Sequence, residues 1–573
     1  MNIKHTSQKN RLLPVILAGV FLFLVTASLF YVERQIDQYD VMSVRESIPI
    51  PVFSVPEGIY DQPFELEINA PEGYDIYYTT DGSIPTTRSL RYQKPIHIDP
   101  KKNLNRDILY IQTSLRWRPP QGKQNHGIAV RARCFKSGEG YGKTKSVIYS
   151  NPTIKQHQGF QVVHILMEAD SLFSQERGIY VLGEKYYSKN AMIKIDKNPN
   201  TIRWQKYPAN YHQRGKDWHR PAEFILLDSL GKTLYQQSIR LSIHGSLSRA
   251  YPLKTLRIMS DSINGDPVIH YPFFKELTND IFKAILLRPS GNDYKETMFK
   301  DAAIQQMIKI LGFDIQEYAP AVVYINGNYW GIHQIREKLD ENYLHYKYGA
   351  CLDKIHIFDF TRSNKYELKY GDVQSVQSFQ ELVAYIEENA MTDEKAYQYV
   401  DTQMDIDNFI DYMIVKKLFA NDDWIDNNVR AYKIEQQTEK MSQNNIEAGK
   451  WRWFAYDFDL SMLVSPSMNM FTGHILRHRD LPVASIFLQL LENQEFKEKF
   501  LNRYEFIAMN YLTTPYKLQI VEDFEERYQY EMERHIARWR YPENNINWRK
   551  NVYKMKTFVH KRLEIVLEQL KEL

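Results

Sequence analysis

The sequence has little cysteine and little net charge. Its 573 residues contain two cysteines, Cys134 and Cys351, which lie far apart in the chain. Two distant cysteines exclude a disulfide framework and the paired-cysteine type of zinc site. The 73 basic and 70 acidic side chains leave a formal net charge of +3. So balanced a charge argues against the concentrated basic face that nucleic acid requires, and we expect no nucleic-acid partner.

Long apolar runs are also scarce, because only the N-terminus contains one long enough to cross a membrane. Lys4, Lys9 and Arg11 precede an apolar run over residues 12–32. Its length suits a transmembrane anchor. Basic residues before such a run predict a cytoplasmic N-terminus and export of everything after Glu33. We therefore expect a membrane-anchored protein whose large domains lie outside the cytoplasm.

A cleavable signal is the alternative to an anchor. Val25-Thr26-Ala27 could serve as a cleavage site, in which case the protein would be secreted. The apolar run continues through Leu29, Phe30 and Tyr31, and this continuation favours the uncleaved anchor.

The whole sequence is 43% hydrophobic and 25% charged, which is typical of folded domains. Short strands and turns come first, and helical periodicity dominates beyond residue 375. This order predicts an α+β protein with a small β-sandwich before a two-lobed domain. The expected segments are a cytoplasmic region (1–11), an anchor or signal (12–32), a stalk (33–46), a β-sandwich (47–155) and a large domain (160–573), with a β-rich lobe at about 160–345 and a helical lobe at about 375–573.

The β-sandwich is predicted from alternating strands and turn residues. Residues 76–80 are β-branched or aromatic and lead into the turn sequence Asp81-Gly82-Ser83, and residues 128–135 alternate with period two. The segments YYTTDGSIPT (77–86), YQKPIHI (92–98) and AVRARCFKSG (129–138) resemble the β-sandwich domain found at the C-terminus of chitobiases. The resemblance implies a glycan contact through residues 47–155, but a rigid spacer that holds the next domain off the membrane is the favoured interpretation.

Local signals also predict several elements of the large domain. Residues 295–311 show an amphipathic helical pattern that ends at Gly312, and residues 406–418 show a second one. Asn326-Gly327 predicts a hairpin turn between two strands. GIYVLG (178–183) and residues 450–456 have the composition of strands.

Two acidic segments are the candidates for chemistry. FANDDWIDNN (419–428) follows a predicted helix, and the apolar strand before Tyr456 ends in Asp457-Phe458-Asp459. Carboxylate and amide oxygens are the ligands that Mg²⁺ prefers. Asp423 and Asn428 have the five-residue spacing of the catalytic Asp and metal-binding Asn of protein kinases. A helix cap or a structural Ca²⁺ loop is the alternative for these residues.

Longer motifs resemble the CotH family of atypical, protein-kinase-like proteins. They are RLSIHGSLSRAYPLKTLRI (240–258), LLRPSGNDYKETMFKD (286–301), VYINGNYWGIHQIREKLDENY (323–343), NDDWIDNN and YDFD, which occur in family order within residues 160–573. The resemblance implies an ATP- and Mg²⁺-dependent protein kinase with a protein substrate. A non-catalytic surface or envelope scaffold on the same fold is the alternative, and departures such as Pro289, where the family favours Asn, are compatible with it.

The resemblance also implies site roles. Lys254 would reach the ATP phosphates with Glu337 as its ion-pair partner, and Asp423 would be the catalytic-loop aspartate. Arg257 and Arg288 would bind the nucleotide, and together with Asn292 and Asp293 they would line or brace the site. The implied metal ligands are Asn428, Asp457 and Asp459.

Overall fold

The structure is a computed structural model that describes residues 47–102, 104, 106–192, 203–262, 265–277, 279–360 and 366–573. The predicted cytoplasmic region, the anchor or signal and the stalk all lie outside these residues. Within the described ranges, no helix combines the length and the apolar character needed to pass through a membrane.

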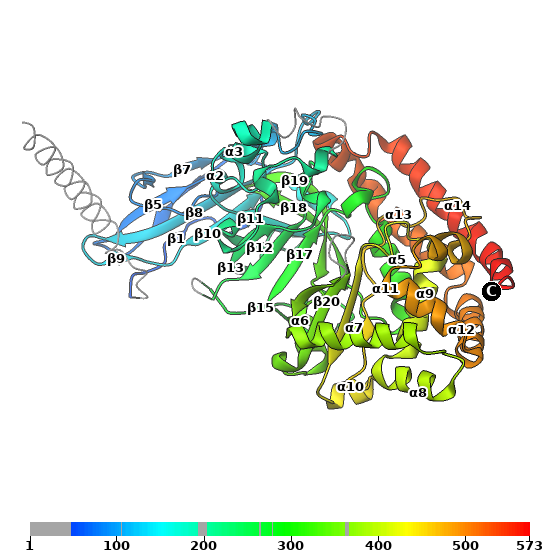
Figure 1. Cartoon of the computed structure of the whole chain (residues 1–573). Coiled ribbons are helices and arrows are strands. Elements are labelled where there is room, and N and C mark those ends of the chain that lie inside the picture. Colours follow the sequence, from blue (N-terminus) through cyan, green and yellow to red (C-terminus); the bar gives the residue numbers. More distant parts are fainter. Residues whose placement is uncertain are drawn as a thin grey trace, which may run out of the picture. The chain divides into compact units, whose positions relative to one another are not determined.

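The chain divides into two compact units. Of the described residues, the smaller unit contains 47–56, Gln62–Asp99 and Ala129–Val147, and the larger contains Glu57–Asp61, Pro100–Ile128 and the rest from Ile148. The smaller unit is all-β and the larger mixes strands with helices (Figure 1), so the architecture is α+β.

The smaller unit is built on antiparallel strands. β8 (Gly127–Lys136) pairs with β5 (Asp75–Thr79), which in turn pairs with β6 (Leu90–Arg91). At the predicted turn after β5, the Asp81 side chain accepts a 2.9 Å hydrogen bond from the Ser83 amide. Short strands β1 (Val52–Phe53) and β4 (Ile68–Asn69), β3 (Phe64–Leu66) and β7 (Ile96–Ile98) form two further pairs.

A segment that the sequence places in the sandwich packs with the larger unit instead. Within Pro100–Ile128, Ile108 and Leu109 are buried in the core of the large β-barrel. The Thr113 and Ser114 hydroxyls donate to carbonyl oxygens of the same unit. The segment is apolar enough to cover that core, and its sequence pattern carries no sign of the partner.

Seven strands of the larger unit close into a barrel of order β11-β12-β13-β14-β17-β19-β18. Side chains alternate between the two faces of a strand, so Ile239, Leu241, Leu256, Ile258 and Ile285 share the buried interior. The barrel strands are β11 (Gln161–Leu166), β12 (Arg220–Leu227), β13 (Thr233–Ile243), β14 (Leu256–Ser260), β17 (Ala284–Arg288), β18 (Tyr318–Ile325) and β19 (Asn328–Glu337).

The hairpin predicted from Asn326-Gly327 joins β18 to β19. Both residues have positive φ, 48° and 81°, as this kind of two-residue turn requires. The predicted helix that comes before this hairpin in the chain ends, as predicted, at Gly312, which has φ 74°. Its start is later than predicted, because α5 spans Lys300–Ile308 and the chain before it contains the short turn η8 (Gly291–Lys295).

The remainder is a four-stranded sheet with a set of helices. The sheet has the order β21-β20-β22-β23, and helices α7 to α14 occupy most of the C-terminal part (Figure 1). The strands are β20 (Ile355–Phe360), β21 (Glu367–Tyr370), β22 (Val429–Ile434) and β23 (Arg452–Trp453), and the main helices are α6 (Glu341–Tyr348), α7 (Val373–Glu388), α8 (Glu394–Gln403), α9 (Ile406–Leu418), α11 (Pro482–Leu490), α12 (Gln494–Phe506), α13 (Thr514–Trp539) and α14 (Asn545–Leu570).

One strand prediction is wrong. GIYVLG (178–183) forms no strand, and its Ile179 and Tyr180 amides bond instead to the carbonyl oxygens of Ser171 and Leu172. Burial explains the apolar composition, because Ile179 and Tyr180 belong to the barrel's core. A short buried apolar run satisfies its backbone through whichever partner lies nearby, so composition alone does not fix its conformation.

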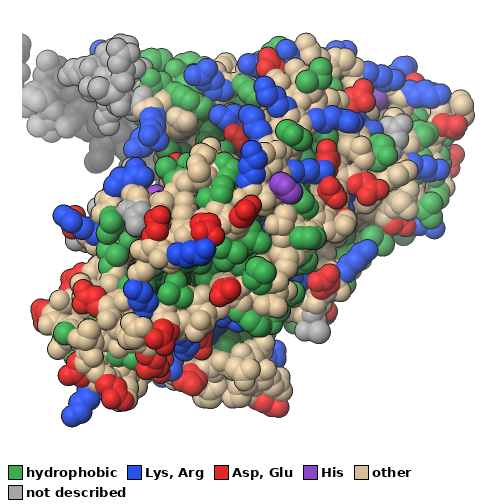
Figure 2. Space-filling model, turned by 90° about the vertical axis from the view of Figure 1, so that its right-hand side faces the viewer, with side chains coloured by type: hydrophobic (Ala, Val, Ile, Leu, Met, Phe, Trp, Pro, Cys, Tyr) green, Lys and Arg blue, Asp and Glu red, His purple; other side chains and the backbone are tan. Residues whose placement is uncertain are grey.

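The molecular face in Figure 2 carries side chains of both charges. Lys and Arg are spread among Asp and Glu over this face. The mixture agrees with the small net charge of +3.

Candidate functional site

The end of strand β17 places a buried arginine among three carboxylates. Arg288 Nη2 lies 2.6 Å from Asp457 Oδ1 and 3.0 Å from Asp459 Oδ2. Arg288 Nε lies 4.0 Å from Asp301 Oδ2. Burial opposes the guanidinium charge, but Asp457, Asp301 and Asp459 together raise the pKa of Arg288. We call Asp301, Asp457 and Asp459 the carboxylate cluster.

The two aspartates of the Asp-Phe-Asp segment differ in access. The Asp459 side chain is 3% exposed and accepts hydrogen bonds from the Asn292 amide at 2.8 Å and from Asn292 Nδ2 at 3.1 Å. The Asp457 side chain is 21% exposed, and among the described residues only Arg288 donates a hydrogen bond to it. Asp459 therefore anchors the segment, while Asp457 can offer an oxygen to a ligand.

The turn that holds Asp459 requires glycine. Gly291 has φ 58°, and a Cβ there would stand 2.0 Å from Asp459 Oδ2. Tyr251 fixes the next residue, because its hydroxyl donates to Asn292 Oδ1 at 2.5 Å. The Gly-Asn pair that follows β17 is thus shaped around the Asp459 carboxylate.

Asp301 holds the same segment from helix α5. Its Oδ1 accepts from the Phe458 amide at 2.8 Å and its Oδ2 from Arg336 Nη1 at 3.0 Å. Burial would raise the pKa of Asp301, but Arg288 and Arg336 lower it to about 2. Asp301 therefore stays ionised. Sequence reasoning missed it, because its contacts come from β17, β19 and residue 458.

The second acidic segment meets the first directly after helix α9. Asn421 Nδ2 donates to the Asp457 carbonyl oxygen at 3.0 Å, and Asn428 Nδ2 donates to Asp423 Oδ2 at 3.0 Å. Asn428 and Asp457 both have φ 56°, which is strained for residues other than glycine. Such strain is often found at functional sites. The structure thus brings together the two segments that the sequence singled out.

A buried lysine on α9 lies between the two segments. Lys416 is fully buried, and its Nζ donates to the Tyr456 carbonyl oxygen at 2.8 Å. Burial lowers the pKa of Lys416 to about 7, against the opposing effects of Asp457, Asp301 and Asp423. Sequence reasoning missed this residue. The available signal was Lys416-Lys417 in a helix whose other residues from Phe409 to Leu418 are all buried.

Lys254 is not part of this cluster and is not paired with Glu337. Its buried Nζ donates to the Tyr251 carbonyl oxygen at 2.6 Å and lies 4.2 Å from the centre of the Tyr211 ring. Burial, helped by Arg249, holds the pKa of Lys254 well below its usual value.

Glu337 is equally unsuited to that ion pair. It lies at the end of β19, where its Oε2 accepts from the Glu317 amide at 3.2 Å. Burial raises the pKa of Glu337 to about 8, so most of it is protonated at neutral pH. The predicted pair is not formed because Lys254 is held by the Tyr251 carbonyl oxygen and the Tyr211 ring, while Glu337 is held by the Glu317 amide.

Arg257 lies on the same barrel face as Arg288. Arg257 on β14 is paired with Leu286 on β17, and Arg288 is two residues further along that strand. Residues two apart share a face. Arg257 is half-buried, and its Nε has no hydrogen-bond partner among the described residues. The barrel thus presents two arginines on one surface, one already on the carboxylates and one with an unused donor.

The oxygen ligands that the protein offers would bind a magnesium ion only together with the phosphates of a nucleotide and with water. Within the described part of the chain, no three His, Cys, Asp or Glu side chains are grouped closely enough to hold a metal. Mg²⁺ is commonly bound through one or two carboxylates, several waters and the phosphates of a nucleotide. Asp457, with an oxygen that accepts no hydrogen bond, and the Asn428 amide oxygen would suit that arrangement.

Two stretches of the chain are similar to known protein families. Residues 241–566 match the family described as CotH kinase protein, and residues 55–106 match the chitobiase/beta-hexosaminidase C-terminal domain. No curated protein matches the chain. A crystal structure of the Helicobacter pylori proinflammatory kinase CtkA aligns with 50% of this chain and 91% of its own at 10% identity, with a TM-score of 0.21 that is too low to support an argument. Because the first match covers more than half of its residues, the chain belongs to the CotH kinase protein family.

Proposed function

We propose that the protein is an exported or membrane-anchored protein kinase that transfers phosphate from Mg-ATP to Ser or Thr of surface proteins. The observation that carries the proposal is the contact between the two acidic segments beside Lys416. Asp457 and Asp423 act on the same lysine, whose pKa both of them raise against burial. Phosphoryl transfer depends mainly on positioning and on neutralising charge, and this cluster can supply both.

Each residue then has a proposed role. Asp423 accepts the proton of the substrate hydroxyl, and Asp457 with Asn428 would hold Mg²⁺. The ion would neutralise charge on the phosphates. Asp459 and Asp301 position Asp457 through the contacts described above.

The phosphates need cationic partners as well. Arg257 and Arg288 lie on the barrel face nearest the cluster and can bind phosphate oxygens. Lys254 would first have to leave the buried site between the Tyr180 and Tyr211 rings. We therefore assign the phosphate contacts to the two arginines.

Phosphate transfer from labelled ATP tests the proposal directly. We expect Mg²⁺-dependent labelling of Ser or Thr by the full chain, and a loss of about 10²–10⁴-fold in Asp423→Asn, because a positioned proton acceptor contributes about that factor. The neighbouring Asp422 is exposed, so Asp422→Asn is the matched control and should keep its activity. Equal activity of the two variants would contradict the assignment of Asp423.

A scaffold function is the second candidate, and one observation favours it. Arg288 already contacts both Asp457 and Asp459, so the cluster is neutralised without a ligand. A scaffold would bind no nucleotide and could contact glycan through the chitobiase-type domain. A structural Ca²⁺ site would be stabilised more by Ca²⁺ than by Mg²⁺, with no effect of ATP.

Export is proposed from the N-terminal sequence. Protease added to intact spheroplasts should degrade the large domain, because basic residues before the apolar run keep only the N-terminus inside. A cytoplasmic protein of the same cells serves as the control and should survive. If the large domain also survives until the membrane is broken, the proposed orientation is wrong.

A further inference from the structure

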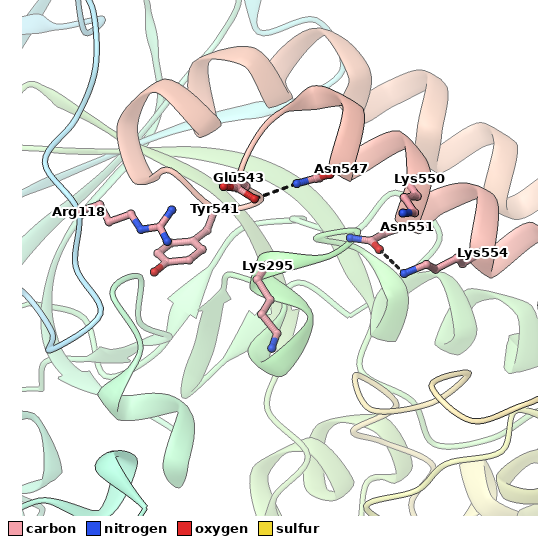
Figure 3. A pocket seen from close by; sticks show the side chains of 8 residues that line it. All are labelled: Arg118, Lys295, Tyr541, Glu543, Asn547, Lys550, Asn551 and Lys554. Carbon is pink, nitrogen blue, oxygen red and sulfur yellow. Dashed lines mark hydrogen bonds between the residues drawn. The ribbon is translucent and has the colours of Figure 1, made fainter.

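The larger unit contains a hollow that none of the carboxylate-cluster residues lines. It has a volume of about 360 Å³ and is formed by Arg118, Lys295, Tyr541, Glu543, Asn547, Lys550, Asn551 and Lys554. Figure 3 shows Lys550, Asn551 and Lys554 along helix α14 on one side, Arg118 beside Tyr541 on the other, and Lys295 between them. We call this hollow the basic pocket.

Positive charge in the basic pocket is not neutralised. Four of its side chains are cationic, and the one carboxylate, Glu543, is engaged by Asn547 Nδ2 at 3.0 Å. None of the four cations forms an ion pair with another described residue. Elsewhere in the same unit Lys300 and Lys309 each bind carboxylates within 3 Å.

The ligand chemistry follows from these donors. Arg118 is exposed, and its guanidinium lies 4.9 Å from the centre of the Tyr541 ring, which orients it while leaving its N–H groups available. Lys295, Lys550 and Lys554 are exposed ammonium groups on separate turns. Such a set matches several oxygen anions on one ligand, as on a chain of acidic or phosphorylated side chains.

A chain of contacts connects the basic pocket with the candidate active site. Its wall residue Tyr541 contacts Tyr294 at 5.3 Å between ring centres, and Tyr294 stacks on Tyr251 at 4.6 Å. The Tyr251 hydroxyl donates to Asn292, which holds Asp459. A segment bound in the pocket would therefore lie two aromatic rings from the residues that position the cluster.

We propose that the basic pocket docks an anionic segment of a protein substrate, carrying carboxylate or phosphoryl side chains. This docking role rests on the proposed kinase function, because it supplies the substrate for that reaction. Binding of the anionic segment in the basic pocket requires neither nucleotide nor metal. Binding is electrostatic, so it should weaken as salt rises.

Peptide binding to the full chain tests the proposal without ATP or Mg²⁺. The probes are a fluorescent peptide rich in Glu, the same peptide with phosphoserine in place of Glu, and a neutral Gln peptide. We expect both anionic peptides to bind and the Gln peptide not to. The stronger of the two anionic peptides identifies the preferred anion.

Matched variants on helix α14 locate the binding. Lys550 and Lys561 are both exposed lysines on this helix, and only Lys550 lines the pocket. Lys550→Glu should lower the affinity for the preferred peptide about tenfold or more, which corresponds to about 1.4 kcal/mol. Lys561→Glu should change that affinity less than twofold. The Asp457→Asn variant should bind the peptide with the affinity of the parent. Loss of kinase activity can then be told apart from loss of peptide binding. Equal effects of the two lysine changes, or tighter binding of an RNA oligomer than of either peptide, would overturn the proposal.

Discussion

Asp457→Asn is expected to abolish the stabilisation of the folded chain by Mg-ATP that the proposed function predicts. A ligand present at a hundredfold excess over its Kd stabilises a protein by about 2.7 kcal/mol. The gain should vanish because Asp457 is the member of the cluster with an oxygen open to a ligand, while Asp459 and Asp301 are committed to internal hydrogen bonds.

The measurement is unfolding of the full chain with and without Mg-ATP. Without ligand, Asp457→Asn should unfold almost as the parent does, because Arg288 keeps Asp459 and Asp301 as partners. The control is Asp353→Asn, since the Asp353 side chain is 76% exposed. A full Mg-ATP effect in Asp457→Asn would remove this residue from the metal site.

Arg288→Met is expected to destabilise the fold by about 3–5 kcal/mol, the usual result of leaving buried charges without a partner. The 14% exposed guanidinium is the shared counter-charge of Asp457 and Asp459. Burial and Asp457 already raise the pKa of Asp459, and Arg288 lowers it. Without Arg288 the pKa of Asp459 should rise further, so the folded variant binds more protons than the folded parent above the pKa that Asp459 has in the parent. Its stability relative to the parent should then fall as pH rises.

Urea unfolding at pH 5 and pH 8 measures both effects. Arg177→Met is the control, because Arg177 and Glu168 form an exposed ion pair worth about 0–1 kcal/mol. Adding Asp457→Asn to Arg288→Met should recover part of the loss, since it removes one unpaired charge. A loss below about 1 kcal/mol, or one that does not depend on pH, would show that the cluster does not need its arginine.

Local sequence signals predicted the elements whose conformation is set locally. Asn326-Gly327 forms the turn between β18 and β19, Gly312 ends a helix, and the 406–418 pattern is helix α9. Each depends on a backbone preference or on helical periodicity within one segment. The strand prediction for GIYVLG was wrong because its apolar residues pack into the core of a barrel whose strands lie elsewhere in the chain.

In the candidate site, too, the sequence predicted individual residues but not the contacts between distant parts of the chain. Family motifs pointed to Arg288, Asp423 and Asp457, but a motif does not say which charges meet. The contact of Arg288 with Asp457 spans 169 residues, and Lys416 becomes visible only once α9 is packed beside both acidic segments. The Lys254–Glu337 pair was predicted from the motifs but is not formed. The fold buries each side chain beside other partners, which a motif does not show.

Calorimetric titration of the full chain with ATP, in the presence of Mg²⁺, of Ca²⁺ or of EDTA, tests the central claim most directly. The claim is that the carboxylate cluster binds a nucleotide through Mg²⁺. It predicts saturable ATP binding with Mg²⁺ that disappears in EDTA and in Asp457→Asn. No heat of binding for ATP with Mg²⁺, in a chain that still unfolds cooperatively, would contradict the claim and favour the scaffold.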